Sequence, residues 1–363
     1  MKIMTVLGTR PEIIRLSLVI KKLDKLAEQH ILVHTGQNFV PSLNDIFFQQ
    51  LSLRDPDYVL MHSKQSLGNQ LSVMFSELEK IFLKEQPDKL LILGDTNSGL
   101  SAILAERMGI PVFHMEAGNR CFDNNVPEEV NRRLIDAISS FNLPYTPNSK
   151  ENLIREGVNS ERIYLTGNPI YEVLNHYEQE INQSGILSKL NLKKKNYMLV
   201  TIHRTENVDH EPTLKNILNG FNDIANFFQM RMICSLHPRT ASKLSDATVQ
   251  ILSPLIEFHE PFGFFDFVNL EKNARLVLTD SGTVQEECCI FQIPTVTVRT
   301  TTERPETIEC GSNMLSGVQR EQIFHAAQVM LEQKNRWVCP EGYLEQHVSN
   351  KVINLLLGGI GVV

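Results

Sequence analysis

The sequence lacks the features that mark several protein classes. Its 363 residues carry 35 Lys and Arg against 42 Asp and Glu, a formal net charge of −7. Nucleic-acid and membrane surfaces favour clustered basic residues, so we expect neither partner. The six cysteines show no CxxC spacing, which disfavours a zinc site or a redox pair. Asp55-Pro56-Asp57 follows no predicted strand, so we expect a turn there and no metal site.

Long apolar runs are also missing. The first apolar segment stops at Gly8-Thr9-Arg10, too early for a signal peptide. No stretch reaches the ~18 uninterrupted apolar residues that a membrane span needs. We therefore expect a cytoplasmic protein with reduced cysteines. The length suggests two domains at about 150 residues each, and 42% apolar residues suffice for full cores.

Short apolar runs alternate with helical patterns along the chain. One amphipathic helix is predicted over residues 11–27, with proline in its first turn. Apolar runs without strict alternation are typical of parallel strands that helices cover on both faces. The pattern predicts an α/β fold with two doubly wound parallel sheets. The predicted strands include Ile3–Leu7, Leu90–Leu93, Pro111–Phe113, Met198–Ile202, Met232–Ser235, Leu276–Leu278 and Thr295–Val298.

We place the domain boundary at Gly167-Asn168-Pro169, which gives an N-terminal domain over 1–168 and a C-terminal domain over 169–349. A polar helical stretch over 171–183 follows the boundary. Two α/β domains that face each other form a cleft at the carboxyl ends of their strands. Open α/β sheets bind ligands at that edge.

Two junctions between a strand and a helix are candidate anion sites. Gly8-Thr9-Arg10-Pro11-Glu12 opens a helix, and Arg10 and Arg15 add positive charge, although Arg15 is as often a solvated residue. Thr279-Asp280-Ser281-Gly282-Thr283 can cradle a diphosphate or serve as an ordinary helix N-cap. GxxxxGK[ST] and GxGxxG are absent, which disfavours a P-loop NTPase and a dinucleotide site.

Carboxylates gather after strands of the first domain. Asp95 and Glu116 each follow a strand, and Glu128-Glu129 begin a helix, where carboxylates also suit the helix dipole. Carboxylates that converge on one cleft are costly unless they share protons or face cations. His203 follows the first strand of the second domain. A lone histidine at a strand end is more often structural than catalytic, but a position opposite this cluster raises the odds of a catalytic role.

Three other residues at strand ends keep a structural alternative. His114 and His237 follow strands, and the first interpretation for each is structural. Arg304 lies in the loop Thr302–Glu306, where it either starts a salt-bridged helix or faces a phosphate or ribose.

Eight motifs make the chain resemble the non-hydrolysing UDP-N-acetylglucosamine 2-epimerases, in family order and over nearly the whole length. The resemblance implies two Rossmann-like domains in the GT-B arrangement, with a C-terminal helix, about 350–363, that packs back on the first domain. It also implies a UDP-sugar substrate, a homodimer, and no metal or nicotinamide cofactor. The motifs are GTRPE (8–12), HTGQ (34–37), GDTNS (94–98), HMEAG (114–118), PEEVNR (127–132), HRTEN (203–207), LTDSGTVQEE (278–287) and TTERPE (301–306).

The resemblance also implies a reaction. Such enzymes invert C2 of a UDP-N-acetylhexosamine by eliminating UDP to a 2-acetamidoglycal-type intermediate and adding it back. This needs an acid and a base on opposite sides of the sugar. The implied catalytic residues are Asp95, Glu116, Glu128 and His203. The implied substrate-binding residues are Arg10, Arg15, His237, Phe267, Ser281, Gly282, Thr283, Glu287 and Arg304.

Departures from the common pattern narrow the expected substrate. Asn119–Pro127 is shorter than in the usual N-acetylglucosamine enzymes, and Asn38-Phe39-Val40 after TGQ argues against an allosteric nucleotide-sugar site. The strings HTGQN, GDTNS and HMEAGNRCFD resemble a capsule and O-antigen branch that converts UDP-2-acetamido-2,6-dideoxy-L-talose (UDP-N-acetyl-L-pneumosamine) to UDP-N-acetyl-L-fucosamine. We expect this substrate, with Phe122 as a candidate contact of the 6-deoxy sugar.

Three alternatives remain open. The nearest is conversion of UDP-N-acetylglucosamine to UDP-N-acetylmannosamine. The others are a GT-B glycosyltransferase, which transfers the sugar to an acceptor, and a non-catalytic nucleotide-sugar sensor.

Overall fold

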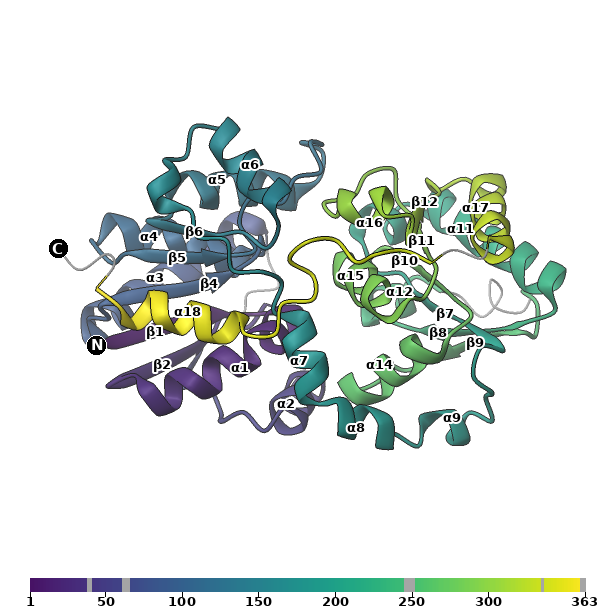
Figure 1. Cartoon of the computed structure of the whole chain (residues 1–363), viewed down its shortest axis with the longest axis horizontal. Coiled ribbons are helices and arrows are strands. Elements are labelled where there is room, and N and C mark those ends of the chain that lie inside the picture. The colour runs from purple at the N-terminus through teal and green to yellow at the C-terminus, as the bar shows by residue number, and fades with distance from the viewer. Residues whose placement is uncertain (38–40, 61–65, 245–251, 334–335, 360–363) are drawn as a thin grey trace. The chain divides into compact units, whose positions relative to one another are not determined.

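The computed structural model describes residues 1–37, 41–60, 66–244, 252–333 and 336–359, with the side chains of 41–45 left out. Two expectations therefore fall partly outside the description: Asn38-Phe39-Val40 and the end of the C-terminal helix. The chain forms two compact units, Met1–His176 with Glu341–Val363 (unit 1) and Tyr177–Pro340 (unit 2). Each unit holds one six-stranded parallel sheet with helices on both faces, so the predicted α/β architecture is confirmed (Figure 1).

The sheet of unit 1 has the strand order β3-β2-β1-β4-β5-β6. The strands are β1 (Lys2–Leu7), β2 (Gln29–His34), β3 (Tyr58–Val59), β4 (Lys89–Leu93), β5 (Val112–Met115) and β6 (Phe141–Leu143). The helices are α1 (Arg10–Leu26), α2 (Pro41–Gln50), α3 (Leu67–Glu85), η1 (Asn97–Leu100), α4 (Ser101–Arg107), α5 (Pro127–Ile138), α6 (Pro147–Arg155), η2 (Ser160–Arg162), α7 (Ile170–His176) and α18 (Val348–Leu357).

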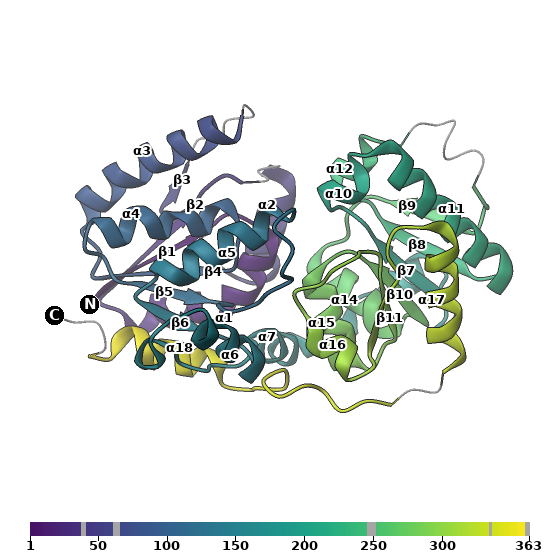
Figure 2. The ribbon, with the colours of Figure 1, turned by 90° about the horizontal axis from the view of Figure 1, so that it is seen from above.

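Both faces of this sheet are covered, which explains the apolar runs in the sequence. Met4 and Val6 of β1 belong to a buried cluster with residues of α3, α4 and α5. On the other face, α1 packs against β1 and β2, and α7 and α18 pack against α1. Figure 2 shows α3 and α4 on the opposite side of the sheet from α18.

The sheet of unit 2 has the strand order β12-β11-β10-β7-β8-β9. The strands are β7 (Tyr197–Thr201), β8 (Arg231–Ser235), β9 (Ile256–His259), β10 (Leu276–Thr279), β11 (Thr295–Thr297) and β12 (Asn313–Leu315). The helices are α8 (Glu178–Gln183), α9 (Ile186–Lys189), α10 (Thr205–Val208), α11 (Glu211–Phe228), α12 (Pro238–Ala241), α14 (Phe264–Asn273), α15 (Gly282–Phe291), α16 (Pro305–Glu309) and α17 (Arg320–Glu332).

Successive side chains of β7 enter two different cores, as the period of a strand requires. Met198 and Val200 pack with α11 and α17. Tyr197 and Leu199 pack with α14 and α15. Helices therefore cover both faces of this sheet as well.

The structure differs from the sequence-based prediction in two elements. β5 extends to Met115 and does not end at Phe113, because residues 113–115 pair with β6. The single helix predicted over 171–183 is two helices that break at Tyr177. α7 packs on α1, whereas the buried Tyr177 ring contacts Phe264 and Phe265 of unit 2. The two units accordingly divide at Tyr177, one helix later than the boundary placed at 167–169.

Within the described residues, none of the helices combines the length and the hydropathy needed to cross a bilayer.

Candidate active site

Each sheet contains one point where the strand order reverses, between β1 and β4 in unit 1 and between β7 and β10 in unit 2. Connections leave such a point in opposite directions, so the carboxyl ends of the two strands stay open to a ligand.

Glu116 follows β5 directly and is paired with a buried cation. The Arg15 guanidinium donates a hydrogen bond to the Glu116 carboxylate, and the Arg15 side chain is 1% exposed. Arg15 also lies over the Tyr145 ring, 5.8 Å from its centroid. Glu116 has a φ of +67°, which costs about 1–3 kcal/mol in a non-glycine residue and is common at functional sites. The predicted phosphate ligand Arg15 thus lies beside a predicted catalytic carboxylate.

Asp95 follows β4 and is held by α5. Arg132 donates to Asp95 Oδ2 from Nε at 3.1 Å and from Nη2 at 2.5 Å. The Asn131 side-chain amide donates to the Asp95 carbonyl at 2.9 Å. β4 and β5 are neighbours in register, with Leu93 opposite Met115. The structure therefore brings Asp95 and Glu116 to the same sheet edge, each with its own arginine.

Glu12 joins the ends of β1 and β4 and was absent from the predicted site. Its carboxylate accepts hydrogen bonds from the backbone N–H groups of Gly8 and Thr9 at 2.9 and 2.7 Å and from the Thr96 hydroxyl at 2.9 Å. Burial raises the pKa of Glu12 to about 7, and these hydrogen bonds oppose the rise. Arg10, two residues before Glu12, lies 5.7 Å from the Phe47 ring centroid, and burial lowers its pKa.

The adjacent residues Glu128 and Glu129 have different surroundings. Glu129 is fully buried and accepts hydrogen bonds from the N–H groups of Cys121 and Phe122 at 3.0 and 3.2 Å and from Arg132 Nη1 at 2.6 Å. Glu128 is half-buried. Glu129 therefore anchors the loop 119–126, and Glu128 remains the candidate for chemistry. In that loop Phe122 has a φ of +56° and a side chain that is 68% exposed.

His114 has the surroundings expected of a structural histidine. Its ring is buried between the Gly94 carbonyl, at 2.9 Å, and the Asp136 carboxylate, at 2.9 Å. Asp136 also pairs with Arg120 at 2.7 Å. The pKa of Asp136 lies below its usual value: burial acts to raise it, and the hydrogen bond with His114 and the Arg120 charge outweigh that effect.

His203 is positioned by a buried carboxylate that the sequence analysis did not assign to the site. Asp280 accepts hydrogen bonds from the N–H groups of His203 and Arg204 at 2.9 and 2.8 Å and from the Asn207 amide at 3.0 Å. His203 Nδ1 lies 3.2 Å from Asp280 Oδ1, and the His203 ring is 35% exposed. This contact leaves Nε2 as the outer nitrogen. The His237 ring lies 5.5 Å from the His203 ring.

Ser281-Gly282-Thr283 forms the N-terminus of α15, with Ser281 at the N-cap. Backbone N–H groups at such a position favour an anion. A Cβ atom at Gly282 would lie 2.9 Å from Glu303 Oε1, so a larger residue there would displace the end of the Glu303 side chain. The buried Arg304 guanidinium donates to Glu286 of α15.

The remaining predicted ligands lie on the helices of unit 2. His237 caps α12, and its Nδ1 accepts from the Arg239 N–H at 3.2 Å. Glu287 on α15 is buried beside Glu271 of α14, and burial together with the charge of Glu287 raises the pKa of Glu271. Phe267, also on α14, is half-buried against the adjacent core.

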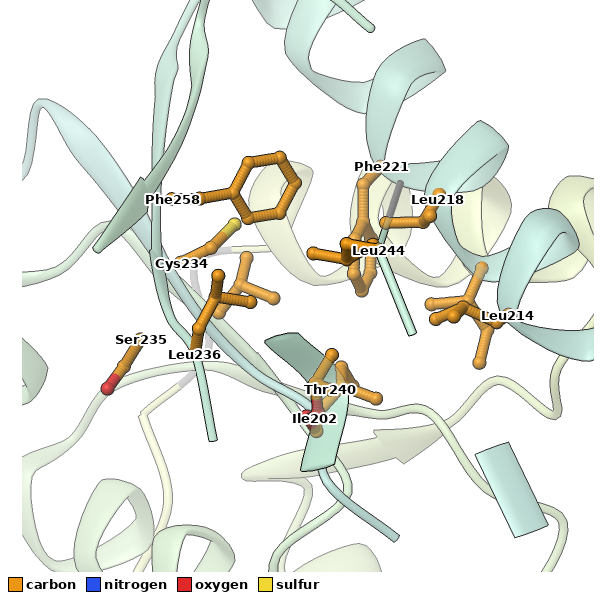
Figure 3. A pocket seen from close by; sticks show the side chains of 12 residues that line it. Ile202, Leu214, Leu218, Phe221, Cys234, Ser235, Leu236, Thr240, Leu244 and Phe258 are labelled. Carbon is orange, nitrogen blue, oxygen red and sulfur yellow. Dashed lines mark hydrogen bonds between the residues drawn. The ribbon is translucent and has the colours of Figure 1, made fainter. Parts of the chain in front are cut away.

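A separate apolar cavity of about 20 Å³ lies between the β7–β8 side of the sheet and α11. Figure 3 shows Cys234, Phe258 and Phe221 around it. A space of this size holds about one water molecule, so it is not a sugar site. Over the described ranges no group of three or more His, Cys, Asp or Glu residues is placed to hold a metal ion. Asp57 of the DPD turn accepts the Leu32 N–H at 2.7 Å.

The chain is similar to known proteins over most of its length. The sequence model of the family described as UDP-N-acetylglucosamine 2-epimerase matches residues 21–357. The chain is 41% identical over 350 residues to UDP-N-acetylglucosamine 2-epimerase of Methanocaldococcus jannaschii, covering 94% of this chain and 95% of that protein. It is 34% identical to UDP-2,3-diacetamido-2,3-dideoxy-D-glucuronate 2-epimerase of Pseudomonas aeruginosa, covering 91% of this chain and 92% of that protein.

A solved structure shares the fold over the whole length. The crystal structure of the M. jannaschii UDP-GlcNAc 2-epimerase in complex with UDP-GlcNAc and UDP matches with a TM-score of 0.94 at 40% identity, covering 99% of this chain and 100% of that one. The chain therefore belongs to the UDP-N-acetylglucosamine 2-epimerase family and is an isomerase that acts on a UDP-sugar.

Proposed function

We propose that the protein inverts C2 of a UDP-N-acetylhexosamine by eliminating and re-adding UDP. The observation that carries this proposal is the pair Asp95 and Glu116 at the carboxyl ends of the neighbouring strands β4 and β5, each held by a buried arginine. Side chains fixed in this way are ready to move a proton at a defined position, because little reorganisation is needed during the reaction.

The proposed reaction is an elimination followed by an addition. A carboxylate takes the proton from C2, the C2–H electron pair forms a C1–C2 double bond, and the C1–O bond breaks as UDP leaves with its electron pair. Return of UDP to C1 and delivery of a proton to the other face of C2 give the epimer. We assign the base and acid roles to Asp95, Glu116 and Glu128, with His203 beside the leaving diphosphate.

Unit 2 supplies most of the proposed UDP site, and Arg10 and Arg15 of unit 1 are added to it. The N–H groups of Ser281-Gly282-Thr283 face the diphosphate, because the N-terminus of a helix favours anions. Glu287 suits the ribose hydroxyls, and Phe267 suits the uracil face. The basic and imidazole side chains of Arg10, Arg15, His237 and Arg304 complete the proposed set.

Two sugars are candidates for the hexose. Exposed Phe122, in the loop that Glu129 anchors, favours a 6-deoxy sugar, because the C6 methyl group suits an apolar contact. On this ground we propose UDP-N-acetyl-L-pneumosamine as the substrate and UDP-N-acetyl-L-fucosamine as the product, for capsule or O-antigen synthesis. The second candidate is UDP-N-acetylglucosamine, which is favoured by the relatives that are described as acting on it.

Incubation with each UDP-sugar in D2O tests the proposal. Solvent deuterium should enter C2 of the true substrate, as followed by proton NMR, and Glu116→Gln should slow the exchange. Exchange into the gluco compound and not the 6-deoxy compound would select the second candidate. No exchange with either sugar would contradict an epimerase of this mechanism. Transfer to an acceptor without exchange would indicate a glycosyltransferase instead.

The family resemblance also supports a homodimer. Sedimentation equilibrium of the full chain tests this part of the proposal separately, and a monomer at micromolar concentration would contradict it.

A further inference from the structure

Three thiols of unit 2 gather where α15 ends. Cys289 lies in α15, Cys310 follows α16, and Cys339 lies beyond α17. Cys289 Sγ is 3.8 Å from Cys310 Sγ. Cys339 Sγ is 3.5 Å from the carbonyl oxygen of Cys289. We call these three residues the thiol cluster. The cluster plays no part in the proposed epimerisation.

The members of the thiol cluster differ in access to solvent. Cys289 is fully buried, and the Trp337 indole N–H donates to its carbonyl at 2.9 Å. Cys310 and Cys339 are half-buried. An accessible thiol beside a buried one provides a first sulfur for an oxidant and a second sulfur to resolve the product.

The pKa values of Cys310 and Cys289 also differ. The hydrogen bond with Cys289 lowers the pKa of Cys310 to about 6, whereas the same bond raises the pKa of Cys289. Cys310 is therefore the more acidic thiol of the pair, and the thiolate is the reactive form of a cysteine. Cys310 Sγ also lies 3.4 Å from the Ser312 hydroxyl.

We propose that Cys310 and Cys289 are a modification site that hydrogen peroxide converts to a reversible disulfide. The Cys310 thiolate attacks the peroxide, so an S–O bond forms, the O–O bond breaks and hydroxide leaves. Cys289 then attacks the sulfenic sulfur of Cys310, an S–S bond forms, and the hydroxyl group leaves as water with the Cys289 proton. Two electrons pass from the two thiols to the peroxide.

The disulfide acts on the two helices that carry part of the proposed UDP site. α15 begins at Gly282, and Arg304 is the N-cap of α16. Shortening the Sγ–Sγ distance from 3.8 Å to about 2.0 Å shifts the end of α16 against α15. Resting on the proposed function, we expect UDP binding to weaken by about tenfold, because contacts with the diphosphate tolerate little displacement.

The test uses the full chain and hydrogen peroxide. After treatment with peroxide, the number of titratable thiols should fall from six to four. Peptide mapping without reducing agent should recover a Cys289–Cys310 disulfide. Dithiothreitol should reverse both changes. Cys310→Ser should abolish the link. Cys121→Ser is the matched control, because it removes a half-buried thiol of unit 1 and should leave the link intact.

Several results would overturn the proposal. One is that all six thiols remain titratable after treatment with peroxide. Another is that Cys310 is oxidised to sulfinic acid and forms no disulfide. The third is a disulfide between Cys289 and Cys339. UDP titration by calorimetry then compares the reduced and oxidised chains, and equal affinities would refute the effect on the nucleotide site. Failure of the reduced chain to bind UDP contradicts the proposed function instead, and the peptide map distinguishes the two cases.

Discussion

At the scale of single residues, buried polar partners decide how the charged groups of unit 1 are placed. Asp95 depends on Arg132, and Glu116 depends on Arg15. Glu12 holds the turn after β1 through bonds to Gly8 and Thr9. Each of these contacts fixes a donor or acceptor that would be costly to leave unpaired.

Asp95→Asn should abolish most catalysis and leave nucleotide binding intact. A positioned acid or base contributes about 10²–10⁴ in rate, so we expect kcat to fall by that factor. UDP affinity should stay unchanged, because the proposed diphosphate contacts of α15 lie in unit 2. Exchange at C2 in D2O and calorimetry with UDP measure the two quantities. Asp55→Asn, in the exposed turn, is the control, and normal exchange by Asp95→Asn would refute the assignment.

Glu12 should make the stability of the protein depend on pH. Its folded-state pKa of about 7 lies above the ordinary value of 4.5. Between these values the folded chain holds a proton that the unfolded chain has lost, so the free energy of unfolding falls as the pH rises. The loss grows from about pH 4.5, is complete above about pH 7, and amounts to about 3 kcal/mol. The free energy of unfolding, measured by urea at several pH values, should change less steeply with pH in Glu12→Gln than in the wild type. The same dependence on pH in both proteins would contradict this account.

The sequence could predict which polar residues follow the strands of each unit but not the partners that hold them. Asp95, Glu116 and His203 stand at the ends of apolar runs, which is a local signal. Arg132 meets Asp95 across 37 positions, and Asp280 meets His203 across 77. Such pairs depend on how neighbouring strands and helices pack together, so they cannot be predicted from the spacing of residues along the chain.

At the scale of elements, α5 fixes both a catalytic candidate and the loop that precedes it. Glu129→Gln should lower the free energy of unfolding by about 1–3 kcal/mol, because Arg132 Nη1 then loses its buried carboxylate partner, whereas Asp95 still pairs with Nη2. Glu128→Gln should leave the melting temperature unchanged and lower kcat by about 10²–10⁴. Each variant serves as the control for the other. Calorimetry measures the stability of both, and the exchange assay measures their activity. A comparable loss of stability in both would contradict the distinction.

Strands were predictable because their apolar runs are buried on both faces. β1, β4, β8 and β10 lie within one residue of the predicted limits at each end. The break at Tyr177 could not be predicted, because residues 171–183 have a continuous helical pattern. It follows from the contact of the Tyr177 ring with Phe264 and Phe265, which lie far away in the sequence.

At the scale of the whole molecule, the chain leaves unit 1 at Tyr177 and returns to it at Glu341. The returning segment ends in α18, which packs on α1. The Lys22 ammonium donates to the Ser349 hydroxyl at 2.6 Å, and the Lys89 ammonium donates to the Leu356 carbonyl at 2.8 Å. The last helix of the sequence is therefore part of the fold of unit 1.

Leu356→Ala should destabilise unit 1 selectively. Leu356 is 0% exposed, and truncating a buried leucine costs about 2–5 kcal/mol. The single tryptophan, Trp337, lies in unit 2 and reports on that unit by fluorescence. In urea, the far-UV circular dichroism of the variant should show an earlier transition, whereas the Trp337 fluorescence transition stays at the wild-type midpoint. Leu344→Ala, at a position 48% exposed, is the control. An equal shift of both signals in Leu356→Ala would show that α18 does not act on unit 1 alone.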